Sequence, residues 1–143
     1  MASFVLVDAS VTICAAGGSP VDLSDHCKSV TVDYSAESPE CTAMGGTGTK
    51  QRLPGLKDWK IDVEFNQDYA AANVGLTLFP LLGALVDIDV CATSEVASAT
   101  NPHYIGTGIL TKYNPLSGKV GDVNITKCEV VAALTILDQV VTP

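Results

Sequence analysis

Among the residues of this chain, five carboxylates have the type and spacing best suited to catalysis. Each alternates with apolar residues in one of three stretches of the chain. They are Asp33, Asp62, Glu64, Asp87 and Asp89. Paired carboxylates act as general acid and base or nucleophile in glycosidases. Nothing near these five supplies a cleft for stacking a sugar, because the single tryptophan lies in the apolar phase of its strand. Two interpretations remain: the solvated face of an antiparallel sheet, or an acidic face on adjacent strands that serves a purpose.

The other residues that could catalyse a reaction or bind a metal lack the spacing that such sites need. His26 and His103 are the only histidines, and neither lies in a motif that pairs a base with a nucleophile. Cys27 follows His26, but neighbouring side chains of a strand point to opposite faces. No C-x-x-C pair occurs among the five cysteines, which are Cys14, Cys27, Cys41, Cys91 and Cys128. We therefore expect no catalytic residue, no cofactor and no metal, and mostly buried, reduced thiols.

A glycine-rich string at residues 45–50 (GGTGTK) is only superficially like a phosphate-binding loop. The Walker motif has four residues between its two glycines, ends in Gly-Lys-Ser or Gly-Lys-Thr, and leads into a helix. Here Thr49 precedes Lys50, Gln51 follows it, and the next element is a strand. We interpret this string as a flexible loop.

Composition and charge limit the class of protein. The 143 residues suffice for a single domain, residues 1–143, with a core of its own. The hydrophobic fraction of 47% argues against a disordered chain. The net charge of −8 argues against a surface that grips nucleic acid, because phosphate contacts are made by cations. It does not argue against a surface that nucleic acid passes without sticking. No run approaches the ~18 apolar residues of a membrane span, and the first residues predict a strand rather than a signal peptide.

Alternation of apolar and polar residues predicts a mainly β chain. The clearest strand spans residues 58–65 and places four large side chains on one face, with Val30 and Val32 joining them from another strand. Those four side chains are Trp59, Ile61, Val63 and Phe65. Further strands are predicted at residues 11–14, 29–34, 85–90, 104–112 and 124–137.

Two segments depart from the strand pattern. Residues 69–82 predict the one helix, with Asp68 as its N-cap, although Gly75 and Pro80 weaken the pattern. Residues 35–55 have no apolar period and are rich in glycine, threonine, serine and proline. Loops of that length inside a compact domain are usually functional or disordered.

Several strings, in their order along the chain, resemble one protein family. They are residues 21–26 (VDLSDH), 29–34 (SVTVDY), 42–45 (TAMG), 55–59 (GLKDW), 63–68 (VEFNQD), 77–81 (TLFPL), 106–110 (GTGIL) and 115–118 (PLSG). Together they look like the small tail proteins of long-tailed, siphovirus-like bacteriophages, and above all like major tail tube proteins. The resemblance covers about residues 3–137, and the five cysteines are not part of the family's pattern.

The resemblance implies an antiparallel β-sandwich or half-barrel with one flanking α-helix and a long inter-strand loop. It implies hexameric rings, with strands from six subunits forming an inner barrel, and rings that stack through the long loop. The inter-ring residues would be Cys41, Met44, Gly45, Gly46, Gly48, Lys50 and Arg52. The five alternating carboxylates would then face the lumen and repel DNA that passes during ejection.

The same resemblance implies partners and a location. The chain would associate with itself and with other tail proteins, namely the tape measure, the tail terminator and the baseplate or tip. It would assemble in the host cytoplasm and reside in the virion tail, without membrane contact and without specific DNA binding. Alternatives are a capsid decoration or minor tail protein, or a host-surface-binding sandwich. Proteins of that last class expose aromatic side chains on loops. Here aromatic residues make up 6% of the chain, and most of them follow the alternation of the predicted strands. An enzyme is the weakest alternative.

Overall fold

The computed structural model describes residues 9–45, 48–69, 74–133 and 135–142. Eight strands form one antiparallel sheet in the order β2-β1-β5-β6-β7-β4-β3, and β8 pairs with β6 beside this path. The strands are β1 Ser10–Ala15, β2 Val21–Asp22, β3 Cys27–Ala36, β4 Lys57–Asn66, β5 Leu85–Cys91, β6 His103–Tyr113, β7 Ile125–Ala132 and β8 Asp138–Val140. The helical segments are η1 Ser24–His26, α1 Val74–Leu78 and η2 Phe79–Leu81. The described part of the chain is mainly β, and its sheet is open. This confirms the predicted fold class.

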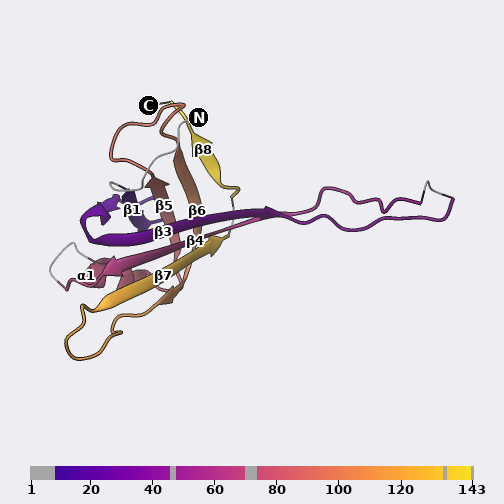
Figure 1. Cartoon of the computed structure of the whole chain (residues 1–143). Helices are drawn as coiled ribbons and strands as arrows, with labels where there is room; N and C mark the ends of the chain where they lie inside the picture. Colours follow the sequence, from indigo (N-terminus) through magenta and orange to yellow (C-terminus); the bar gives the residue numbers. More distant parts are fainter. Residues whose placement is uncertain (1–8, 46–47, 70–73, 134, 143) are drawn as a thin grey trace.

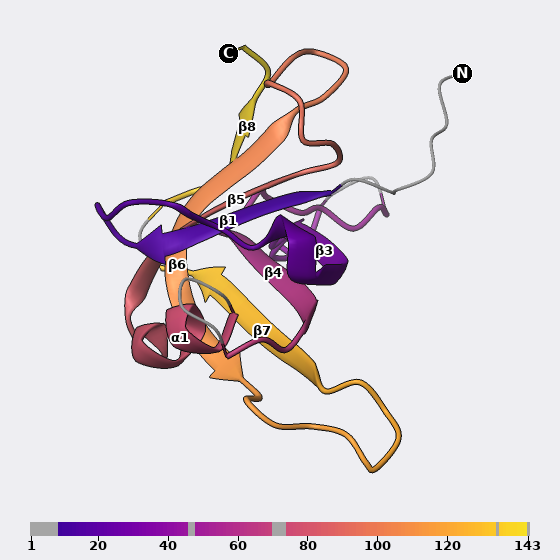
Figure 2. The ribbon, with the colours of Figure 1, turned by 90° about the vertical axis from the view of Figure 1, so that its left-hand side faces the viewer.

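The sheet curls over a core that lies on one of its faces. Figures 1 and 2 show β3, β4 and β7 crossing the direction of β5 and β6. Buried apolar residues from both halves of the sheet form one cluster. The alternation predicted for β4 is confirmed, since each of its four large apolar residues is at most 2% exposed. Val30 and Val32 of β3 pack against them. Tyr34 shares their phase but is 46% exposed, because this end of β3 runs beyond the core.

The indole of Trp59 lies against β6 at two glycines. A Cβ on Gly106 would come within 2.6 Å of Cζ2 of the Trp59 ring, and a Cβ on Gly108 within 2.9 Å of its Cη2. The indole Nε1 donates a hydrogen bond to the carbonyl of Thr135 at 3.0 Å. The largest side chain of the core therefore depends on the absence of side chains at these two positions of β6, which faces it across the core.

The strand predicted at residues 124–137 is wrong in its second half. β7 ends at Ala132, which pairs with Gly108, and the chain returns to β6 only at Asp138, opposite Ile105. The connecting segment is longer than the part of β6 that it passes, so it loops out of the sheet. The loop is held by Thr135, whose Oγ1 accepts a hydrogen bond from the backbone N–H of Thr107 at 3.2 Å.

The helix is shorter than the predicted range of residues 69–82. Tyr69 lies outside it, residues 70–73 fall outside the described residues, and α1 covers Val74–Leu78. The turn then tightens into η2, where Pro80 stands at the start because proline has no N–H for an α-helical bond. No helix in the described ranges is long and apolar enough to cross a membrane.

Candidate assembly surfaces: a projecting arm and a charged sheet face

The connection between β3 and β4 projects from the body as a paired arm, residues 37–56 (Figure 1). Its two legs are joined by backbone hydrogen bonds: Glu37 N–H donates to the carbonyl of Leu56 at 2.8 Å, and Leu53 N–H to that of Pro39 at 3.0 Å. Further out, Cys41 N–H donates to the carbonyl of Gln51 at 2.8 Å. The arm is therefore a continuation of the β3–β4 hairpin beyond the core.

The described inter-ring residues of the sequence prediction all lie on this arm, and all are exposed. They are Cys41, Met44, Gly45, Gly48, Lys50 and Arg52, whereas Gly46 lies outside the described residues. Gly45 and Gly48 flank the tip with φ of 88° and 82°, a backbone region that favours glycine. These glycines let the chain reverse at the tip.

The arm exposes three large apolar side chains and carries no net charge. Met44 is 102% exposed, Leu56 76% and Leu53 57%. The arm has two carboxylates and two cations, so the rest of the chain bears the whole net charge of −8. Large apolar side chains gathered on a projecting hairpin mark a surface that a partner covers.

The second surface is the outer face of β3, β4 and β7, which carries three of the five predicted carboxylates. Asp62 of β4 stands opposite Glu129 of β7, and Asp33 of β3 stands opposite Lys60. Nζ of Lys60 lies 3.4 Å from Oδ2 of Asp62 and 3.9 Å from Oε2 of Glu129. These two carboxylates raise the pKa of Lys60 above its ordinary value. The lysine thus offsets the repulsion between like charges on paired strands.

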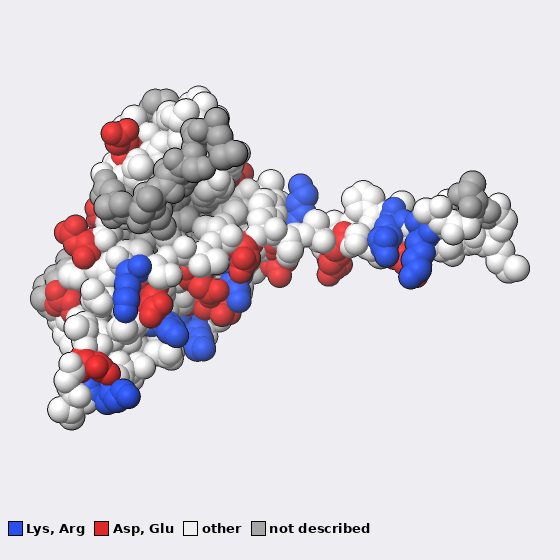
Figure 3. Space-filling view, viewed as in Figure 1, with Lys and Arg blue, Asp and Glu red and all other residues white. Residues whose placement is uncertain are grey.

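Glu64 lies further along β4 in a shallow groove of about 300 Å³ on this same face. The groove is also lined by Glu129, Lys112 and Lys127. Figure 3 shows acidic and basic side chains interleaved over the body below the base of the arm. The sequence alone does not place Lys112 and Lys127 beside these carboxylates, because their position next to β4 depends on the long-range pairing of β7 with β4 and β6.

Asp87 and Asp89 lie on β5, which β6 and β7 separate from β4. The expectation of one acidic face on adjacent strands therefore does not extend to these two residues. Oδ1 of Asp87 accepts a hydrogen bond from the Thr107 hydroxyl at 2.6 Å, and its Oδ2 accepts one from the N–H of Gly17 at 3.1 Å. The carboxylate joins the turn after β1 to the sheet.

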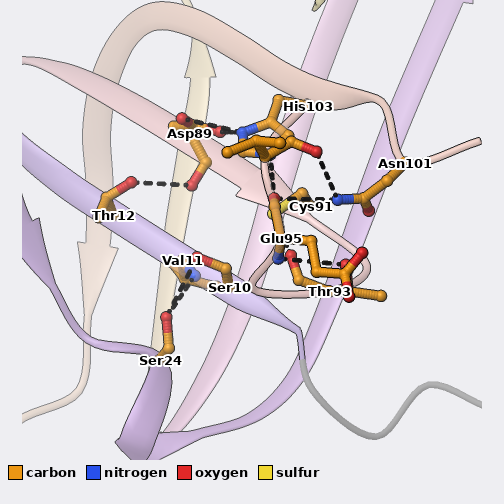
Figure 4. Close-up of polar contacts among 11 residues, drawn as sticks. Ser10, Val11, Thr12, Ser24, Asp89, Cys91, Thr93, Glu95, Asn101 and His103 are labelled. Atoms are coloured by element: carbon orange, nitrogen blue, oxygen red, sulfur yellow. Dashed lines mark hydrogen bonds and ion pairs between the residues drawn. The ribbon is translucent and has the colours of Figure 1, made fainter. Parts of the chain in front are cut away.

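Asp89 takes part in a separate polar cluster with His103 (Figure 4). Nδ1 of His103 lies 3.2 Å from Oδ1 of Asp89, and its Nε2 lies 3.1 Å from the carbonyl of Glu95. Asn101 donates from Nδ2 to that same carbonyl at 3.0 Å. The cluster fixes the connection between β5 and β6, so Asp89 has a local structural role.

The cysteines provide no metal site. All five are free thiols; Cys14, Cys91 and Cys128 are buried and Cys41 is exposed on the arm. Burial raises the pKa of Cys128 from 9.0 to about 12. Across the described part of the chain, no three His, Cys, Asp or Glu side chains form a group that could hold a metal ion.

The fold is that of chains from tail and injection assemblies. A chain from the tail of an empty gene transfer agent (GTA) particle with C6 symmetry aligns over 92% of this chain and 95% of its own, with a TM-score of 0.71 and 13% identity. A chain from the six-fold symmetrised baseplate of the anti-feeding prophage aligns over 99% and 98%, with a TM-score of 0.63 and 10% identity. A chain from the sheath–tube complex of an extracellular contractile injection system aligns over 96% and 93%, with a TM-score of 0.64 and 16% identity. No protein-family model matches the sequence, and neither does any curated protein.

Proposed function

We propose that the chain is the tube subunit of a phage-like tail, which assembles with itself into hexameric rings that stack around a channel for DNA. The observation that carries the proposal is the arm, residues 37–56, because a free subunit gains nothing from a projecting hairpin with exposed apolar side chains. The likeness of the whole fold to chains of six-fold tail and baseplate assemblies supports it. The tail of a long-tailed phage is the specific setting that we propose.

The arm is long enough to join one ring to the next. Each leg has ~10 residues, which span about 30 Å in extended conformation. The body has a radius of gyration of roughly 14 Å, and therefore a diameter of about 35 Å. An arm of one subunit can thus extend along most of a stacked neighbour. A contact between two different surfaces of identical subunits repeats without closing, which builds a filament.

Contacts within a ring would use the free edge of the sheet. β3, Cys27–Ala36, stands at the end of the strand order with unpaired backbone groups on its outer side. A long free edge promotes aggregation in a monomer, whereas pairing around a six-fold axis satisfies it and closes the ring. We therefore place subunit–subunit pairing in a ring at this edge.

The charged face of β3, β4 and β7 would then line the channel. Asp33, Asp62 and Glu64 would recur six times in each ring, and the ion pairs of Lys60 make this clustering tolerable. Asp87 and Asp89, on β5, would lie outside this lining. At ~0.15 M salt the repulsion of DNA acts only within about 8 Å, so the lining prevents sticking without driving movement.

The partners and location follow from this role. A tube must end on other tail proteins, so we propose contacts with a tape measure, a tail terminator and a baseplate or tip, and a place in the virion tail after assembly in the host cytoplasm. DNA would pass without specific binding, and no reaction would be catalysed.

The test is the assembly of the purified chain. Negative-stain electron microscopy and sedimentation velocity should detect tubes or six-fold rings, whose population rises with protein concentration. A chain that stays monomeric at every accessible concentration would contradict the proposal. A chain that stays monomeric but coats capsids would favour the decoration protein instead.

A further inference from the structure

An apolar groove lies beside the short helix. It has a volume of about 210 Å³ and is lined by Tyr69, Gly75, Phe79, Pro80, Tyr113 and Pro115, with no charged side chain among them. Phe79 packs edge-on against Tyr113, with ring centroids 6.5 Å apart, yet Phe79 is 66% exposed. The groove thus offers the exposed rings of Tyr69 and Phe79 to a partner, while the ring of Tyr113 is buried.

The walls of the groove are held in place by hydrogen bonds. The hydroxyl of Tyr69 donates to the carbonyl of Pro115 at 2.5 Å. Nε2 of Gln67 donates to the same carbonyl and to the hydroxyl of Tyr113, both at 2.8 Å. A Cβ on Gly75 would come within 2.7 Å of Cδ1 of the Tyr69 ring, so glycine lets this ring lie flat beside α1. The groove exists before any partner arrives.

The groove and the arm lie at opposite ends of the molecule. In Figure 1 the arm leaves the body on the right and α1 lies on the left. Figure 2 faces this left end and shows α1 beside the loop between β6 and β7. In a head-to-tail stack, the arm of one copy therefore points at the groove end of the next.

The chemistry of the two surfaces is complementary. The arm presents Met44, Leu53 and Leu56, and methionine sulfur makes favourable contacts with aromatic rings such as those of the groove. On the arm, Arg52 stands opposite Glu40 of the other leg, which leaves Lys50 as a cation that can meet acidic side chains. Acidic side chains of η1 and of the segment before Tyr69 lie at the groove end, where His26 Nε2 is 3.8 Å from Oδ2 of Asp68.

We infer that this aromatic groove is the receptor for the arm of a second copy of the chain in the next ring, with Met44, which lies beside the tip of the arm, seated between Tyr69 and Phe79. The inference rests on the proposed tube assembly and adds the surface that receives the arm. It makes the stacking contact a specific pairing of two surfaces at opposite ends of one subunit.

Photo-crosslinking in assembled tubes tests the pairing directly. A photoreactive phenylalanine analogue at position 79 should give a crosslinked dimer, and mass spectrometry should map the link to peptides from residues 37–56. The same analogue at Val96, which is 71% exposed on the connection between β5 and β6, is the matched control and should give no link to the arm. If tubes form but the links from position 79 map outside the arm, the inference is overturned while the proposed function stands. If the unmodified chain forms no assembly, the proposed function itself fails.

Two substitutions test the groove without a probe. Gly75→Ala should push the Tyr69 ring into the groove and lower tube yield while leaving the circular dichroism spectrum unchanged, because alanine is well accepted in a helix. Phe79→Asp should abolish stacking and leave single rings, whereas Val96→Asp should leave tubes intact. Normal tube growth of both groove variants would overturn the inference.

Discussion

The Trp59 indole occupies the space that a side chain on Gly106 would fill. A Cβ at this glycine would lie 2.6 Å from Cζ2 of the indole, 2.9 Å from its Cη2 and 3.2 Å from its Cε2. Trp59 is 2% exposed and is among the largest fully buried side chains of the protein. The contact joins β4 to β6 across the core, and these two strands are not neighbours in the sheet.

Gly106→Ala should therefore destabilise the subunit by overpacking. A methyl group cannot be accommodated unless the indole or the strand moves, and overpacking of a filled core costs about 1–3 kcal/mol. Chemical denaturation of the unassembled subunit measures the loss. Trp59→Phe combined with Gly106→Ala should cost less than the sum of the two single changes, because the smaller ring leaves room. Strict additivity would show that the two residues do not compete for space.

Phe65→Ala should cost about 3–5 kcal/mol of unfolding free energy, because Phe65 is 1% exposed on the core face of β4. The same substitution at the exposed Phe79 is the matched control and should cost about 1 kcal/mol or less. Denaturation curves of the two variants give the comparison. A loss below ~1 kcal/mol at Phe65 would contradict its place in the core.

Stability should fall at alkaline pH because of Cys128. Its pKa is 9.0 when unfolded and about 12 in the folded protein, so the unfolded chain loses the thiol proton first. The contribution of the Cys128 thiol to the free energy of unfolding is complete below pH 9. It falls by about 1.4 kcal/mol per pH unit between pH 9 and pH 12. Cys128→Ala should flatten this dependence, whereas Cys41→Ala, on the exposed arm, should leave it unchanged. Parallel slopes for the two variants would exclude Cys128 as the cause.

The strands of the core could be predicted because burial on one face imposes a two-residue period. Trp59, Ile61 and Val63 follow that period without interruption, and the structure places them in the predicted phase. The break between β7 and β8 could not be predicted, because residues 130–137 are apolar except for Thr135 and the interruption is caused by a distant partner. Thr135 receives the indole N–H of Trp59, and only the three-dimensional structure brings these residues together.

The candidate surfaces could be predicted only in part, because an exposed surface does not impose the two-residue period that burial imposes. Residues 35–55 stand out by composition, but the pairing of the legs of the arm leaves no alternation, since neither of its faces is buried. For the charged face, the sequence reveals the residues of one strand but not their partners on the next. Asp62 and Glu64 are visible as the polar phase of one strand, whereas Glu129 reaches them through pairing with β7. Charge balance across strands depends on register, which a single sequence does not reveal.

Deletion of residues 41–49 should leave a folded subunit that no longer forms tubes. The deleted residues that the structure describes are all exposed, and none belongs to the core. The free energy of unfolding should therefore stay within about 0.5 kcal/mol of that of the parent chain. Electron microscopy should reveal rings or monomers without stacks. Tubes of normal length from this variant would remove the arm from the stacking mechanism.

Asp62→Lys combined with Glu64→Lys should spare folding but make assembled tubes hold DNA. Both side chains lie on the polar phase of β4, opposite the core, so their replacement removes no packing. On the proposed channel wall, the change would turn repulsive charges into cations repeated six times per ring, and cations bind phosphates in a salt-dependent way. Ejection assays and DNA retention at low and high salt provide the measurement, with Glu95→Lys combined with Asp138→Lys as a control of equal charge change away from this face. Release at the normal rate from the charge-reversed tubes, or equal retention by the control, would rule out this face as the channel lining.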